Sequence, residues 1–125
     1  MDFAVTLKQN ASSVAATTRD ATFVVRDGWC HGHITLDITA AGTVATELKI
    51  TPDATLPDPA DAYAGSGVGT FYYEDGGTKY VGAVIWDGTD LRFVAHLATG
   101  YLGASPSFAA ANGDSVRVEF SYRHA

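Results

Sequence analysis

Apolar and polar residues alternate along several short stretches of the chain, and Gly, Pro, Asp and Asn residues separate these stretches. The clearest case is residues 116–123, where Val116, Val118, Phe120 and Tyr122 alternate with polar residues. A period of two is typical of β-strands with one face in a core and the other in water. No helical period stands out, so the pattern predicts an all-β protein.

Turn signals such as Asp27-Gly28 and residues 75–77 (Asp-Gly-Gly) punctuate these stretches at regular intervals. About eight short strands with regular turns are typical of an antiparallel sandwich or barrel. The predicted strands are residues 3–8, 22–26, 29–38, 46–50, 68–74, 79–86, 91–96 and 116–123.

Residues 51–65 form the longest stretch without a strand pattern. Pro52, Pro57 and Pro59 lack the backbone N–H that a sheet needs, and several Asp residues favour turns. A long connection of this kind favours a Greek-key or jelly-roll crossover over a simple meander. We therefore expect an antiparallel β-sandwich of about eight strands, similar to a jelly roll, within a single domain.

Composition narrows the classes of function. The formal net charge is −6, whereas binding of nucleic acid or of an acidic membrane surface requires a basic patch, so we predict neither partner. The single cysteine excludes an internal disulfide. The N-terminal residues show no signal-peptide pattern, and no apolar run approaches the roughly 20 residues of a membrane span. We expect a protein made in the cytoplasm and not secreted.

The strongest candidate for chemistry is the pair His31 and His33, which share one face of a predicted strand. Cupins, which are small β-barrels, bind metal through such a pair, but their pattern requires a Glu shortly afterwards and a His in a later strand. Asp37 is the nearest acid, and Glu47 and His96 are candidates by residue type alone. We therefore reject a metal site and interpret the pair as part of a polar sheet face or of a subunit contact.

Other candidate reactive groups also fail. Alternation points Cys30 inward and His31 outward, so a buried structural thiol is the better interpretation. The Gly-rich residues 65–69 do not form a nucleophile elbow, because position 64 is Ala. They do not form a dinucleotide-binding fingerprint either, because a strand and not a helix follows them. We predict no catalytic residues and no cofactor, and hence a protein that is not an enzyme.

Aromatic residues are frequent in the middle of the chain. Alternation places Phe71 and Tyr73 on one strand face, so Tyr72 must lie on the other. Exposed Tyr and Trp side chains commonly form protein interfaces or sugar-stacking surfaces. The candidate interface aromatics are Tyr63, Tyr72, Tyr80, Trp86 and Tyr101.

Four segments carry a resemblance to a known family: residues 67–73 (Gly-Val-Gly-Thr-Phe-Tyr-Tyr), 80–84 (Tyr-Val-Gly-Ala-Val), 100–106 (Gly-Tyr-Leu-Gly-Ala-Ser-Pro) and 111–122. The last combines a polar Gly-Asp turn with an alternating strand. From about residue 22 onward, the chain resembles the small jelly-roll domains of tailed-bacteriophage virion proteins. The resemblance implies a jelly-roll fold and a place on the outer surface of a virion, and it transfers no catalytic residue.

The resemblance also suggests a division of the chain. Residues 21–125 would form a single jelly-roll domain, and residues 1–20 an N-terminal arm or edge strand. In that arm, Phe3, Val5 and Leu7 would add a strand to a neighbouring subunit.

Two functions are compatible with the resemblance. Fibre-tip proteins carry a longer attachment segment and a shaft, which favours a self-contained capsid decoration (cement) protein here. Such a protein would bind across subunits of the major capsid protein, or to other virion proteins, and would form a homotrimer. The alternative is a receptor- or carbohydrate-binding domain of a tail or head fibre.

Overall fold

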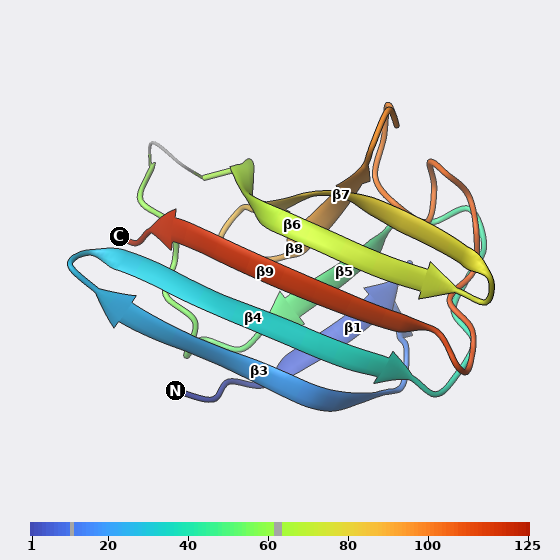
Figure 1. Cartoon of the computed structure of the whole chain (residues 1–125), viewed down its shortest axis with the longest axis horizontal. Coiled ribbons are helices and arrows are strands. Elements are labelled where there is room, and N and C mark those ends of the chain that lie inside the picture. Colours follow the sequence, from blue (N-terminus) through green and yellow to red (C-terminus); the bar gives the residue numbers. More distant parts are fainter. Residues whose placement is uncertain (11, 62–63) are drawn as a thin grey trace.

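The computed structural model of the chain describes residues 1–10, 12–61 and 64–125. It confirms the all-β, antiparallel class and contains a single nine-stranded sheet with the order β2-β1-β5-β8-β7-β6-β9-β4-β3 (Figure 1). No helix in these residues is long and apolar enough to cross a membrane. The strands are β1 (Val5–Gln9), β2 (Ser12–Ser13), β3 (Ala16–Arg26), β4 (Trp29–Ile38), β5 (Leu48–Pro52), β6 (Ser66–Asp75), β7 (Thr78–Trp86), β8 (Leu91–Ala95) and β9 (Ser115–Arg123).

The prediction of a two-sheet sandwich, and with it of a jelly roll, is wrong. The sheet is continuous and strongly curled, so that β1, β5 and β8 lie behind the layer that contains β4, β9 and β6 (Figure 1). The two halves remain joined by β7, which pairs with both β6 and β8. Within the rear half, a two-residue pairing of β5 with β8 keeps the sheet continuous. One curled sheet thus encloses the core that two separate sheets were expected to enclose.

Glycines permit the close strand contacts of this curl. A Cβ atom added at Gly69 in β6 would collide with the backbone carbonyl of Glu119 in β9. A Cβ atom at Gly82 in β7 would collide with the carbonyl of Val94 in β8. A bulge between Gly67 and Gly69 bends β6 further. Gly69 therefore permits the close approach of two backbones.

Long connections link the two halves of the curl. The strands β5 and β6 are not neighbours in the sheet, so the Pro-rich segment between them crosses from one half to the other, as predicted. The connections from β4 to β5 and from β8 to β9 cross in the same way. Short hairpins join β3 to β4 and β6 to β7, with positive φ angles at Asp27, Gly28 and Gly76.

Strands β1 and β2 and the first part of β3 lie within the sheet. Strand β1 pairs with β2 on one side and with β5 on the other, and β3 runs across the expected boundary at residue 20. Residues 1–3 lie along the edge of β3, where the backbone N–H of Phe3 donates to the Ala21 carbonyl and that of Phe23 donates to the Met1 carbonyl. The N-terminal segment therefore joins the two ends of the curled sheet.

Inward-facing side chains of all the long strands form one hydrophobic core. In β9, the four residues predicted to face inward are buried and their neighbours are exposed, which confirms that prediction. Cys30, Ile34, Leu36 and Ile38 of β4 are buried as expected. Aromatic pairs in this core include Phe3 with Phe23, Phe71 with Phe93, and Tyr73 with Phe108.

One polar side chain, that of Gln9, is fully buried among these apolar residues. Its amide nitrogen donates to the carbonyls of Thr46 (3.0 Å) and Phe108 (2.8 Å). Its carbonyl oxygen accepts from the backbone N–H groups of Thr43 (3.0 Å) and Ala110 (2.9 Å). All four hydrogen-bonding positions of the amide are therefore used. They join β1 to the β4–β5 connection and to the β8–β9 connection.

Replacing Gln9 with Leu is expected to lower the free energy of unfolding by about 3–5 kcal/mol, because two buried and two partly buried backbone groups lose their partners. Urea denaturation followed by tryptophan fluorescence measures this change. Thr6→Ala, at an exposed position of the same strand, is the control and is expected to change stability by less than about 0.5 kcal/mol. A Gln9→Leu protein as stable as wild type would show that these hydrogen bonds contribute little.

Candidate functional site

The outer surface of the sheet differs between two groups of strands. On β4 and β9 it is mostly polar, as expected for a face in contact with water. The outward-facing residues there are Trp29, His31, His33, Thr35 and Asp37 on β4, and Arg117, Glu119, Ser121 and Arg123 on β9.

Apolar side chains cover the outer surface of the second group of strands, β6, β7 and β8. In the strand register, Tyr72 pairs with Val81 and Ala83 pairs with Val94, while Ile85 lies further along β7. Val81 is 51% exposed, Ala83 is exposed, and the other three are half-buried. We call these five residues the apolar face. Uncovered apolar patches on a sheet commonly mark surfaces that bind other proteins.

The sequence contains a signal for this face that the search for alternation missed. Residues 80–86 (Tyr-Val-Gly-Ala-Val-Ile-Trp) are apolar without interruption. Continuous apolar runs are typical of strands that are covered on both faces. Val84 and Trp86 account for the inner face because both are buried in the core, whereas nothing in the described chain covers Val81 and Ala83. Strand β7 therefore has the composition of a strand whose outer face meets a partner.

A hollow of about 440 Å³ extends the apolar face beyond the end of β8. Val81, Tyr80 and Pro106 line it, and Leu97 stands at its rim. Leu97 is 89% exposed and has a positive φ of 64°, an unusual backbone conformation for a leucine. A large apolar side chain is thus presented to solvent directly beside the apolar face.

The candidate interface residues occupy three kinds of environment. Phe3, Leu7 and Trp86 are buried in the core of the chain itself, so their side chains do not reach the surface. Val5 is half-buried within the sheet. Leu7 and Trp86 are buried because they occupy inward-facing positions of β1 and β7. The two-sheet prediction did not show that these positions face the core.

Three of the predicted tyrosines are partly accessible. Tyr72 belongs to the apolar face, which confirms its predicted outward direction. The Tyr80 ring stacks on Phe108, with 4.9 Å between the ring centroids. Tyr101 lies beneath the guanidinium of Arg92, whose Cζ is 5.4 Å from the ring centroid. Tyr63 lies outside the described residues.

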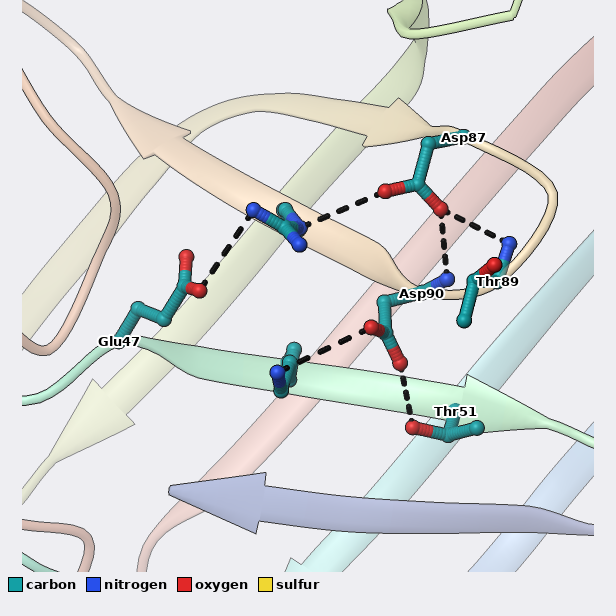
Figure 2. Close-up of polar contacts among 7 residues, drawn as sticks. Glu47, Thr51, Asp87, Thr89 and Asp90 are labelled. Atoms are coloured by element: carbon teal, nitrogen blue, oxygen red, sulfur yellow. Dashed lines mark hydrogen bonds and ion pairs between the residues drawn. The ribbon is translucent and has the colours of Figure 1, made fainter. Parts of the chain in front are cut away.

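A network of charged side chains covers the outer surface where β5 meets β8 (Figure 2). Arg92 lies 3.6 Å from Glu47 and 3.5 Å from Asp87, measured between nitrogen and oxygen. Lys49 lies 3.8 Å from Asp90, which also accepts a 2.5 Å hydrogen bond from Thr51. Lys8, Lys49 and Arg92 are register partners on β1, β5 and β8, so they form a row of positive charges across the strands. The acidic side chains of the network offset this charge.

The same network borders a second hollow, of about 530 Å³. Asn10, Thr46, Glu47, Lys49 and Tyr101 are among the residues that line it. The Oε2 atom of Glu47 is buried and has no hydrogen-bond partner among the described residues. Sequence reasoning named Tyr101 as an interface candidate and Glu47 only as a possible metal ligand, and it did not bring them together because they are distant along the chain.

His31 and His33 lie on the polar outer face, as the strand pattern predicted, and they face different partners. His33 pairs with Asp20 of β3, whereas the Nδ1 atom of His31 lies 2.7 Å from the Ser121 hydroxyl of β9. Among the described residues, no three His, Cys, Asp or Glu side chains gather closely enough to hold a metal ion. The two imidazoles therefore belong to two separate polar contacts.

Cys30 is fully buried in the core, as predicted. Burial raises the pKa of its thiol, although a contact with Tyr122 acts in the opposite direction. A protonated thiol without access to solvent is a poor nucleophile, so the cysteine behaves as a small apolar residue.

Tyr73, Asp75 and Asp114 form a partly buried cluster beside the β6–β7 hairpin. The Tyr73 hydroxyl donates a 2.8 Å hydrogen bond to Asp114, and burial followed by this bond raises the pKa of Tyr73 far above its ordinary value. The same Asp114 oxygen accepts from the backbone N–H of Ala111. Burial and then the negative charge of Asp114 raise the pKa of the Asp75 carboxyl. The cluster connects β6 to the turn before β9 and opens into none of the hollows described above.

Comparison with known proteins finds no matching family model, no matching curated protein and no matching solved structure.

Replacing Asp75 with Asn is expected to stabilise the protein at pH 7, by less than about 1 kcal/mol because the residue is only partly buried. Since the folded pKa is raised, the stability contributed by Asp75 is fully present below its ordinary pKa of 3.8 and is lost as the pH rises through the folded value. Thermal unfolding at several pH values measures both effects. Glu74→Gln removes the same charge from the neighbouring position, so equal stabilisation by both variants would refute a specific role for Asp75.

Proposed function

We propose that the chain is a non-enzymatic structural protein that binds neighbouring subunits of a larger particle through the apolar face. The observation that carries this proposal is the outer surface of β7, where Val81 and Ala83 are exposed within an uninterrupted apolar strand. The sequence resemblance suggests that the particle is a bacteriophage virion. Within that setting, we assign the chain the function of a capsid decoration protein.

The surroundings of the apolar face support a protein partner. Lys79, Glu74 and Arg117 lie around Tyr72 and Val81, so charged groups of both signs border an apolar centre. Protein interfaces commonly combine an apolar centre with a polar rim of this kind. The exposed Leu97 adds a side chain that a pocket on a partner would accommodate.

The partners proposed are further copies of the chain, in a homotrimer, and the major capsid protein. A trimer would use the apolar face for contacts between copies or would align three such faces toward the shell. A protein that binds the assembled shell, and not the loosened one, stabilises the shell by mass action. This mechanism requires a persistent surface and no chemical step, which agrees with a rigid curled sheet.

Particles that lack the gene are expected to lose infectivity at least about tenfold faster on heating than wild-type particles. Complementation with the wild-type gene should restore heat resistance, whereas Val81→Lys should not, because the lysine charge would have to be desolvated at the interface. Ser121→Lys, on the polar part of the same sheet, is the matched control and should restore resistance. Deletion particles as resistant as wild type would refute a cementing function.

Purified wild-type protein is expected to elute as a trimer, with about three times the 13.1 kDa mass of one chain. Size-exclusion chromatography with light scattering measures this mass directly. Monomeric protein at about 100 μM would contradict the proposed trimer. Val81→Lys tests whether the apolar face forms the contact between copies, since only then would it dissociate a trimer that Ser121→Lys leaves intact.

A further inference from the structure

The hollow beside Tyr101 is an open depression with the volume of a small-molecule site. Its volume of about 530 Å³ lies within the range of known ligand pockets. It lies where the ends of β1 and β5 meet the long connection between β8 and β9, on the outer surface of the sheet. It is separate from the apolar face, so an inference about it does not depend on the function proposed above.

Two charged side chains in this hollow keep hydrogen-bonding capacity for a ligand. Glu47 and Lys49 are two residues apart, and both contribute to the lining. The contacts of Glu47 with Arg92 (3.6 Å) and of Lys49 with Asp90 (3.8 Å) exceed the usual length of a hydrogen bond. Both side chains are therefore held in place by charge while their hydrogen bonds remain available.

The second oxygen of Glu47 strengthens this conclusion. Oε2 is buried and has no hydrogen-bond partner among the described residues. An unpaired buried carboxylate oxygen is unfavourable, so a ligand donor recovers free energy when the Glu47 side chain turns this oxygen toward the hollow. Figure 2 shows Glu47 at one end of the charged network, with one carboxylate oxygen directed toward Arg92 and the other outside the drawn contacts.

Tyr101 supplies an aromatic surface in the same hollow. The Arg92 guanidinium, with Cζ 5.4 Å from the ring centroid, stacks on the ring and fixes its position. Backbone hydrogen bonds from Ala104 and Ser105 to the Tyr101 carbonyl hold the loop at this point. An aromatic ring held in this way offers an apolar surface against which a flat ligand can pack.

The lining chemistry selects the class of ligand. Adjacent hydroxyl groups both donate and accept, so one can donate to Glu47 while its neighbour accepts from Lys49. The Asn10 amide adds one further donor and acceptor. An anionic ligand would be repelled by Glu47, and a cationic ligand by Lys49 and Arg92. We propose that this hollow binds a neutral sugar residue of a glycan, with Tyr101 against the ring and Glu47 and Lys49 on its hydroxyl groups.

Titration of ¹⁵N-labelled full-length protein with glucose, galactose, mannose and N-acetylglucosamine tests the proposal. At least one sugar is expected to shift the backbone amide signals of Glu47, Lys49 and Tyr101, with a dissociation constant of about 1–10 mM. Glucuronate, which adds a carboxylate to the glucose framework, should bind more weakly than glucose.

Tyr101→Ala and Glu47→Gln are expected to weaken binding at least about tenfold while the rest of the spectrum shows an intact fold. Trp29→Ala and Glu119→Gln are the matched controls, because they remove an exposed aromatic ring and an exposed carboxylate from the polar half of the sheet. The absence of shifts with all four sugars would overturn the proposal. Equal shifts with glycerol, or undiminished binding by Tyr101→Ala and Glu47→Gln, would overturn it as well.

Discussion

The amide of Gln9 determines how one end of the sheet is built. A curled sheet must bring distant connections together over the open end of its core, and those connections carry backbone groups that need partners. Gln9 supplies four hydrogen bonds at once, two to the segment of Thr43 and Thr46 and two to the segment of Phe108 and Ala110. The first segment leads directly to Glu47, so the position of the proposed sugar site depends on an amide buried beneath it.

The outer surface of a single sheet carries two different kinds of binding chemistry in this protein. Strand β8 contributes to both, because Arg92 belongs to the charged network and Val94, two residues later, belongs to the apolar face. A partner bound at the apolar face would therefore sit beside the hollow at Tyr101. The polar half, on β4 and β9, has the composition of a surface that stays in water, and its histidines take part in separate contacts with Asp20 and Ser121.

Alternation along the sequence predicted which side chains face inward, but it could not predict which strands pair. The inward sets of β4 and β9 were correct because burial on one face imposes a period of two. The single sheet was missed because its continuity depends on a two-residue pairing of β5 with β8, which leaves no sequence signal. Gln9 was missed because its polar side chain breaks the apolar pattern while occupying an inward position. The residues around Tyr101 were missed because only the fold brings them together.

The position of β9 in the sheet has a consequence for how the protein acquires its structure. This strand is synthesised after the other eight, yet it lies between β4 and β6 and pairs with both along most of its length. Until it leaves the ribosome, the β3–β4 hairpin and the β6–β7–β8 meander lack their shared neighbour, and each exposes an unpaired edge. Pairings between segments so distant along the chain are slow to form. The nascent chain therefore passes through a period in which unprotected strands favour association with other chains, and chaperone binding during that period would favour the correct fold.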